Sequence, residues 1–162
     1  MILLSIFAKR DSIGIKNMRD NVDTFTKKHK IIGLDSMLFI YHFEKHKIFW
    51  QKTKKIFELL EKGRFYGITS VITLIEIMTK PKKENNYYLV KEYKELLTTF
   101  PHLEIQDVNL RIGDLASSVR AKYGLTTPDA ILLASSLDSK AGGFITSDVR
   151  LKKVKEIEVF VL

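Results

Sequence analysis

The stretch Lys30-Ile31-Ile32-Gly33-Leu34-Asp35-Ser36 decides the fold of this chain. It is a short apolar run that ends in a carboxylate and is followed by a helix-like pattern. A continuous apolar run bounded by polar residues is typical of a strand buried on both faces, as in a parallel sheet covered by helices. The residue that follows such a strand points into the crevice where α/β folds bind ligands. We therefore expect Asp35 to lie at the functional site.

Strand-like and helix-like segments alternate along the rest of the chain. Four further strands are predicted at residues 64–70, 103–108, 143–147 and 157–162. Helical spacing of apolar residues predicts helices at residues 37–43, 48–60, 71–78, 87–100, 110–123 and 128–141. Ser36 is the predicted N-cap of the first helix, and the helix from residue 71 is expected to end before Pro81. The pattern predicts an α/β three-layer sandwich, with a mainly parallel five-stranded sheet flanked by helices.

The length of 162 residues suits a single domain, and no internal repeat or linker divides it. We assign residues 30–162 to this domain. Residues 1–29 form an N-terminal extension that is mostly polar and weakly periodic. Three alternatives stay open for it: a flexible tail, a helix docked on the domain or on a partner, or a start site placed too early, with Met18 as the true start.

Composition narrows the class of protein. The chain has no cysteine, which excludes disulfides and thiolate metal sites. Its formal net charge of +8 favours a polyanionic partner such as RNA, although a lysine-rich surface without such a partner would give the same value. No apolar run is long enough to span a bilayer, and the first basic residues follow the opening apolar patch, the reverse of a signal peptide. We expect a cytoplasmic protein that does not interact with membranes.

Four carboxylates fall where an α/β crevice is built. Asp35 and Asp148 each follow an apolar strand, whereas Glu76 and Asp129 lie in the first turns of helices. Clustered carboxylates repel one another unless a cation neutralises them. Mg²⁺ and Mn²⁺ prefer oxygen ligands, keep several waters and bind phosphates. The pattern therefore indicates a Mg²⁺ or Mn²⁺ site that acts on a phosphate through metal-activated water.

Each of these acids also has a purely structural interpretation. Asp35 can cap the following helix, and Asp148 can stabilise a tight turn. Thr73 and Glu76 match a capping box, and Asp129 suits the positive end of a helix. The joint occurrence of four acids at strand and helix ends is the stronger argument for a site.

Four segments resemble, in order and spacing, the motifs of PIN-domain nucleases, and most closely the VapC-like toxin branch. These are Ile32–Ser36, Ser70–Glu76, Tyr123–Ala134 and Phe144–Leu151. The most specific parts are the Gly-Leu-x-x-x-Asp-Ala-x-x-x-Ala helix and the Thr-x-Asp-x-x-Leu turn. The resemblance implies a parallel five-stranded sheet between helices and a Mg²⁺- or Mn²⁺-dependent endoribonuclease. It further implies that the catalytic and metal-binding residues are Asp35, Glu76, Asp129 and Asp148.

The same resemblance implies an inhibitory antitoxin protein as partner and a homodimer. Two features depart from the family pattern: Ser147 stands where many relatives have Asn, and the N-terminal extension lies outside the usual domain. The hydroxyls of Ser36, Thr73 and Ser147 are candidates for binding a metal water or a phosphate oxygen, and Arg150 for contacting a substrate phosphate. Capping roles for the hydroxyls and a solvated position for the arginine are the alternatives.

Three other functions are alternatives to a toxin nuclease. A receiver-type signalling domain requires an adjacent acidic pair after the first strand and a lysine after the last core strand, and the chain has neither in place. A non-catalytic RNA-binding PIN domain is expected to have lost part of the acidic quartet, yet all four acids are present. A housekeeping RNA-processing nuclease remains the alternative to the toxin of a type II toxin–antitoxin pair.

Overall fold

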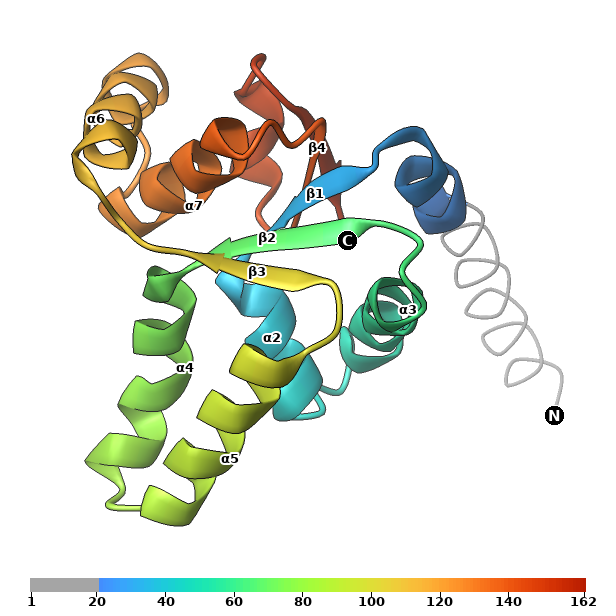
Figure 1. Ribbon diagram of the computed structural model, residues 1–162, viewed down its shortest axis with the longest axis vertical. Coiled ribbons are helices and arrows are strands. Elements are labelled where there is room, and N and C mark those ends of the chain that lie inside the picture. The colour runs from blue at the N-terminus through green and yellow to red at the C-terminus, as the bar shows by residue number, and fades with distance from the viewer. Residues whose placement is uncertain (1–20) are drawn as a thin grey trace, which may run out of the picture.

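A five-stranded parallel sheet forms the centre of the molecule in the computed structural model, which describes residues 21–162 (Figure 1). The strands are β1 (Ile31–Leu34), β2 (Tyr66–Ser70), β3 (Leu103–Gln106), β4 (Gly143–Thr146) and β5 (Glu158–Val161). Their spatial order is β3-β2-β1-β4-β5, and every neighbouring pair is parallel. The expected three-layer α/β architecture is confirmed.

Helices cover both faces of this sheet. They are α2 (Ser36–Phe43), α3 (Trp50–Glu61), α4 (Val71–Lys83), α5 (Tyr87–Thr99), α6 (Leu110–Tyr123) and α7 (Thr127–Asp138), followed by the 3₁₀ helix η1 (Val149–Lys153). Helices α6 and α7 lie on one face, and α2 to α5 lie on the other (Figure 1). None of the helices in residues 21–162 is both long enough and apolar enough to cross a membrane.

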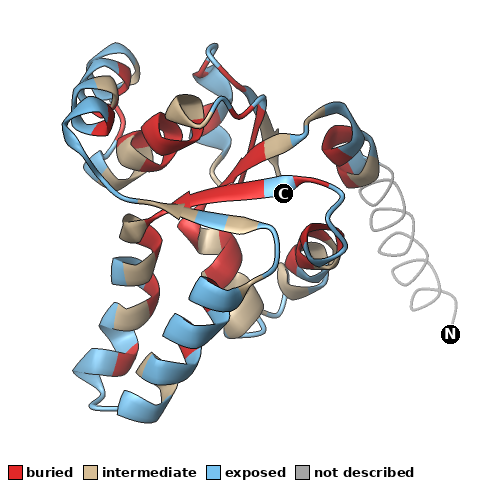
Figure 2. Cartoon of the chain, viewed as in Figure 1, coloured by how far each residue is buried: buried red, intermediate tan, exposed pale blue. Residues whose placement is uncertain are grey.

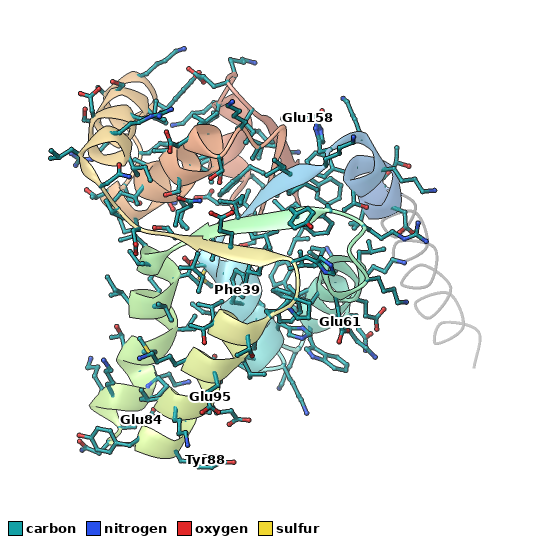
Figure 3. The ribbon with its side chains drawn as sticks, viewed as in Figure 1. Phe39, Glu61, Glu84, Tyr88, Glu95 and Glu158 are labelled. Atoms are coloured by element: carbon teal, nitrogen blue, oxygen red, sulfur yellow. The ribbon has the colours of Figure 1, made fainter. Side chains whose placement is uncertain are left out.

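Each face of the sheet has its own hydrophobic core, because successive strand residues point to opposite faces. Ile32 and Leu34 of β1 belong to the core under α2 to α5, whereas Ile31 packs with the core under α6 and α7. The strand interiors and the inner helix faces are accordingly the buried parts of the chain (Figure 2). Phe39, on α2, is completely buried between the helices and the sheet (Figure 3).

Glycine at position 33 lets α7 approach β1 closely. A Cβ at Gly33 would lie 2.1 Å from the Ser136 Oγ of α7 and 2.5 Å from a ring carbon of Phe144. No real side chain tolerates such distances, so the Ser136 side chain of α7 lies directly against the backbone of β1 at this point. The close approach fixes α7, whose first turn holds Asp129, relative to the end of β1.

Two predicted helix boundaries are wrong. Helix α4 continues through Pro81 to Lys83 instead of ending before the proline. Pro81 removes one backbone hydrogen bond, but its ring is buried, and the following turn is closed by the Glu84 N–H donating to the Lys80 carbonyl at 3.1 Å. At α2 the N-cap is Asp35 rather than Ser36.

Residues 21–28 form a helix whose Val22 and Phe25 are buried in the core shared with α2 to α5. The neighbouring Lys28 and His29 both contact the Glu158 carboxylate of β5, at 2.6 Å and 2.9 Å. This part of the predicted extension therefore packs on the domain. Residues 1–20, with the proposed start at Met18, lie outside the described residues.

Candidate active site

The candidate site lies at the carboxyl ends of β1 and β4. From β1 the chain builds outward through β2 to β3, and then returns to β4 and β5 on the other side of β1. This reversal is a topological switch point, where open α/β sheets bind their ligands. Asp35 directly follows β1, and a single residue separates Asp148 from the end of β4.

Asp35 is a buried carboxylate, only 6% exposed. Its Oδ2 accepts a 2.5 Å hydrogen bond from the Thr146 hydroxyl, and its Oδ1 accepts one from the Met37 N–H at 3.3 Å. Burial is the largest cause that raises the pKa of Asp35 from its ordinary value of 3.8 to about 6, and the charges of Asp129 and Glu76 raise it further. These two hydrogen bonds only partly oppose the rise. The negative form of Asp35 is therefore poorly stabilised by the protein alone.

The other three acids surround the same end of the sheet. Asp129 and Glu76 are close enough to Asp35 for their charges to act on it. Asp129 and Asp148 line one small recess of about 40 Å³, to which Arg150 and Lys153 also contribute. We call this the acid recess. The charges of Asp129 and Glu76 thus reach Asp35, and Asp148 shares a recess with Asp129.

Glu76 stands somewhat apart from the acid recess. It is exposed in the second turn of α4 and lines a different hollow of about 240 Å³ between α2, α4 and α5. The capping-box interpretation of Glu76 is wrong, because α4 is capped by Ser70 and Thr73 lies inside the helix. No capping role therefore accounts for this carboxylate.

Three of the acids do have local structural partners. Asp35 caps α2, and Asp148 caps η1 by accepting a 2.8 Å bond from the Arg150 N–H. Asp129 accepts a 2.6 Å bond from the hydroxyl of Thr126, the N-cap of α7. These bonds hold the carboxylates in place and leave accepting capacity on them, since each ionised carboxylate has about four acceptor sites.

A chain of buried hydroxyls supports the site from below. The Thr69 hydroxyl must donate to the Leu34 carbonyl (3.1 Å), so Thr73 donates to Thr69 (2.7 Å) and Ser36 donates to Thr73 (2.9 Å). All three hydroxyl residues are completely buried. Ser36 and Thr73 are thus too deep to touch a substrate, and they tie α2 and α4 together beneath Asp35. Ser147 is half-buried.

Arg150 already brings a cation to the acid recess. Its Nε and Nη2 donate to the Asp148 carboxylate at 2.6 to 3.0 Å, and this contact is the main cause of the lowered pKa of Asp148. The charge of Asp129 also acts on Arg150. The arginine side chain is 71% exposed, so it can leave Asp148 without unpacking the protein.

The oxygen donors fit a hard divalent cation better than any softer metal, because the chain offers carboxylates and hydroxyls but no thiolate. Within residues 21–162 no three His, Asp or Glu side chains are grouped closely enough to hold a metal together. Mg²⁺ usually binds through one or two carboxylates and keeps its remaining waters. Asp35 and Asp129 would suit that role, because the charge of Asp129 acts on Asp35. His42 and His46 lie four residues apart, a spacing that can bind a metal, but the His46 Nδ1 accepts hydrogen bonds from the backbone of Ile48 and Phe49 instead.

Thr146 is a site residue that sequence reasoning missed. Its hydroxyl oxygen donates to Asp35 and accepts from the Asp148 N–H at 3.0 Å, so it links the two acids. The signal was available in the Thr-x-Asp spacing, because a Thr side chain often bonds the N–H two residues later.

Comparisons with known proteins agree with this fold. The PIN domain profile matches residues 32–157. No curated protein sequence matches the chain. A chain in the crystal structure of VapBC2 from Rickettsia felis, bound to a DNA fragment from the promoter, is similar with a TM-score of 0.65 and 17% identity, covering 81% of this chain and 98% of that one. A chain in a toxin–antitoxin complex from Klebsiella pneumoniae is similar with a TM-score of 0.61 and 21% identity, covering 78% and 94%.

Proposed function

The chain belongs to the PIN domain family, and from that premise we propose that it is a Mg²⁺- or Mn²⁺-dependent endoribonuclease, the toxin of a type II toxin–antitoxin pair. The observation that carries the proposal is the environment of Asp35. A buried carboxylate with a pKa raised to about 6, within range of two further acids, is poorly stable unless a cation joins it. It lies at the switch point of the sheet, where a substrate has access.

Asp35 and Asp129 are the proposed direct ligands of the cation, with Asp148 and Glu76 acting through its waters. When bound, the cation lowers the pKa of a water and neutralises charge on the phosphate under in-line attack. Thr146 fixes the orientation of Asp35. The hydrogen bond between the buried hydroxyls of Ser36 and Thr73 fixes α2 relative to α4. Arg150 is the proposed contact to a non-bridging phosphate oxygen once it has left Asp148, because a guanidinium matches phosphate geometry.

The toxin assignment rests on the fold neighbours. Both are chains from complexes whose descriptions read VapBC2 and toxin–antitoxin complex. We extend the antitoxin partner, the homodimer and the cytoplasmic location to this chain as parts of the same proposal. Leu110 is 94% exposed, and Val149 is also an exposed apolar side chain, so a second copy or an antitoxin has apolar surface to cover.

The ends of the cleaved RNA test the reaction. Purified protein with Mn²⁺ is expected to leave 5′-phosphate and 3′-hydroxyl ends, because a water attacks the phosphorus and the bond to the 3′-oxygen breaks. Asp129→Asn should cut at least about 100-fold more slowly, since it removes a charge that acts on the reacting centre. End mapping by sequencing, with a gel-based rate, measures both.

The matched control is Asp138→Asn at the other end of α7, where the carboxylate pairs with Arg111. This variant should keep wild-type activity. Cyclic 2′,3′-phosphate ends would contradict the scheme, since they require attack by the 2′-hydroxyl of the RNA itself. Equal activity in Asp129→Asn and wild type would also contradict it.

A further inference from the structure

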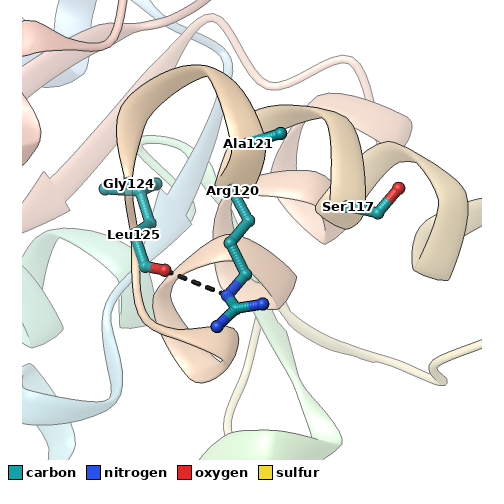
Figure 4. Close-up of a pocket in the computed structure, with 5 residues that line it drawn as sticks. All are labelled: Ser117, Arg120, Ala121, Gly124 and Leu125. Carbon is teal, nitrogen blue, oxygen red and sulfur yellow. Dashed lines mark hydrogen bonds between the residues drawn. The ribbon is translucent and has the colours of Figure 1, made fainter.

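A hollow beside the acid recess has no role in the mechanism above. It is the surface hollow of about 340 Å³ at the end of α6 (Figure 4). Its lining residues are Ser117, Arg120, Ala121, Gly124 and Leu125. We call it the arginine recess, because Arg120 is its single charged residue. The chemistry of that side chain therefore decides what the recess can bind.

The arginine recess adjoins the acid recess. Gly124 and Leu125 line both of them. A Cβ at Gly124 would meet nothing within 4 Å, so the surface at this position is open. At Gly124, therefore, no side chain obstructs a strand that leaves the acid recess toward α6.

One hydrogen bond orients the Arg120 side chain and leaves its terminal donors unused within residues 21–162. Its Nε donates to the Leu125 carbonyl at 3.2 Å, which orients the guanidinium across the loop between α6 and α7 (Figure 4). Its two terminal nitrogens have no hydrogen-bond partner in residues 21–162, and no carboxylate there forms an ion pair with it. A guanidinium oriented in this way, with unused donors, matches the non-bridging oxygens of a phosphate.

Charge favours a nucleic acid as the occupant over an acidic protein. Arg150 and Lys153 line the acid recess, so the two adjoining recesses together contain three cations. The whole chain carries +8. Regularly spaced phosphates on a single strand can pair with such a series, and each pairing releases counterions.

We propose that the arginine recess is a phosphate-binding subsite for single-stranded RNA, in which Arg120 holds a phosphate that flanks the one at the acid recess. The RNA strand then runs from the acids across Gly124 and Leu125 onto α6. This inference rests on the proposed function, since it assigns a second contact for the same substrate.

The first test places a negative charge beside Arg120 and leaves its bond to Leu125 intact. Ser117→Glu adds a carboxylate inside the arginine recess, whereas Ser118→Glu adds one to the next position of the same helix, outside it. Both serines donate to the Asp114 carbonyl, so both variants lose the same local bond. Fluorescence anisotropy of a labelled RNA in EDTA and low salt measures binding without cleavage.

We expect Ser117→Glu to weaken RNA binding about 10-fold, the equivalent of one charge-assisted hydrogen bond, and Ser118→Glu less than about twofold. In cleavage assays with Mn²⁺, Ser117→Glu should raise KM by a similar factor and leave kcat within about twofold. A purely structural disturbance of the α6–α7 loop would instead displace Asp129 and lower kcat.

Arg120→Gln, with Arg111→Gln on the same helix as control, gives a second readout. Only Arg120→Gln should reduce the slope of log affinity against log salt, by about 0.7, the value for one phosphate of a single strand.

Equal effects at positions 117 and 118, or equal slopes for the two arginine variants, would overturn the subsite and leave the nuclease proposal standing if wild type still cleaves. RNA binding that responds to Ser117→Glu without any cleavage would support the subsite and contradict the nuclease. No RNA binding at low salt, with binding of poly-glutamate instead, would assign the recess to an acidic protein and overturn the inference.

Discussion

The Asp35→Asn variant is expected to unfold at a higher temperature than wild type in metal-free buffer at pH 7.5, and to lose RNA cleavage. In wild type the carboxylate is ionised at this pH although it is buried, and its pKa of about 6 lies above the ordinary 3.8. This difference corresponds to a destabilisation of about 3 kcal/mol, which asparagine removes. The gain is equivalent to a rise in Tm of about 5–10 °C. Loss of activity with gain of stability is the signature of a residue kept for function.

The destabilisation by ionised Asp35 should depend on pH in a defined direction. Between about pH 4 and pH 6 the folded protein keeps a proton on Asp35 that the unfolded chain has lost, so wild-type stability falls as pH rises through this window. Asp148, Glu156 and Glu158 have lowered pKa values and act in the opposite direction, but they do so equally in both proteins. The informative quantity is therefore the difference in the free energy of unfolding between wild type and Asp35→Asn. Urea denaturation in EDTA from pH 4 to 7.5 measures it, and parallel stability curves would show that Asp35 is not destabilised by burial.

Gly33→Ala is expected to destabilise the fold by about 3 kcal/mol or more. The added methyl would lie 2.1 Å from the Ser136 Oγ and 2.5 Å from the Phe144 ring, so α7 must move away from β1. Because α7 carries Asp129, the surviving folded protein should also cut RNA more slowly. Urea denaturation measures the loss of stability.

The control for this substitution is Gly113→Ala on α6, where an added Cβ meets nothing within 4 Å. Alanine favours a helix over glycine, so this variant should be more stable than wild type by about 0.5–1 kcal/mol. A Gly33→Ala protein as stable as wild type would contradict the close approach of α7 to β1.

Apolar patterning was sufficient to predict the sheet, because a strand buried on both faces leaves a continuous run such as Ile31–Leu34. It was equally effective for α6, where Gly124 closes the helix at a positive φ of 61°. Helix ends that depend on tertiary contacts were not predictable. Pro81 is tolerated inside α4 because its ring is buried against the rest of the protein, and no local rule contains that information.

The acids were identifiable individually as residues at element ends, but their supports were not. The bond from Thr146 to Asp35 spans 111 positions of sequence, and the bond from Ser36 to Thr73 spans 37. Such pairs exist only after the strands have taken their order. The arginine recess could not be predicted for the same reason. In the sequence Arg120 does not differ from other surface arginines, and only the folded loop places the Leu125 carbonyl next to its Nε.

Titration of the metal-free protein with Mn²⁺, followed by thermal unfolding, tests the central claim most directly. If Asp35 and its neighbours form a site that a divalent cation completes, Mn²⁺ at 100 times its Kd should stabilise wild type by about 2.7 kcal/mol. Asp35→Asn, already more stable without metal, should gain little, and Asp138→Asn should gain as much as wild type. Equal stabilisation of wild type and Asp35→Asn by Mn²⁺, or none in either, would contradict the account.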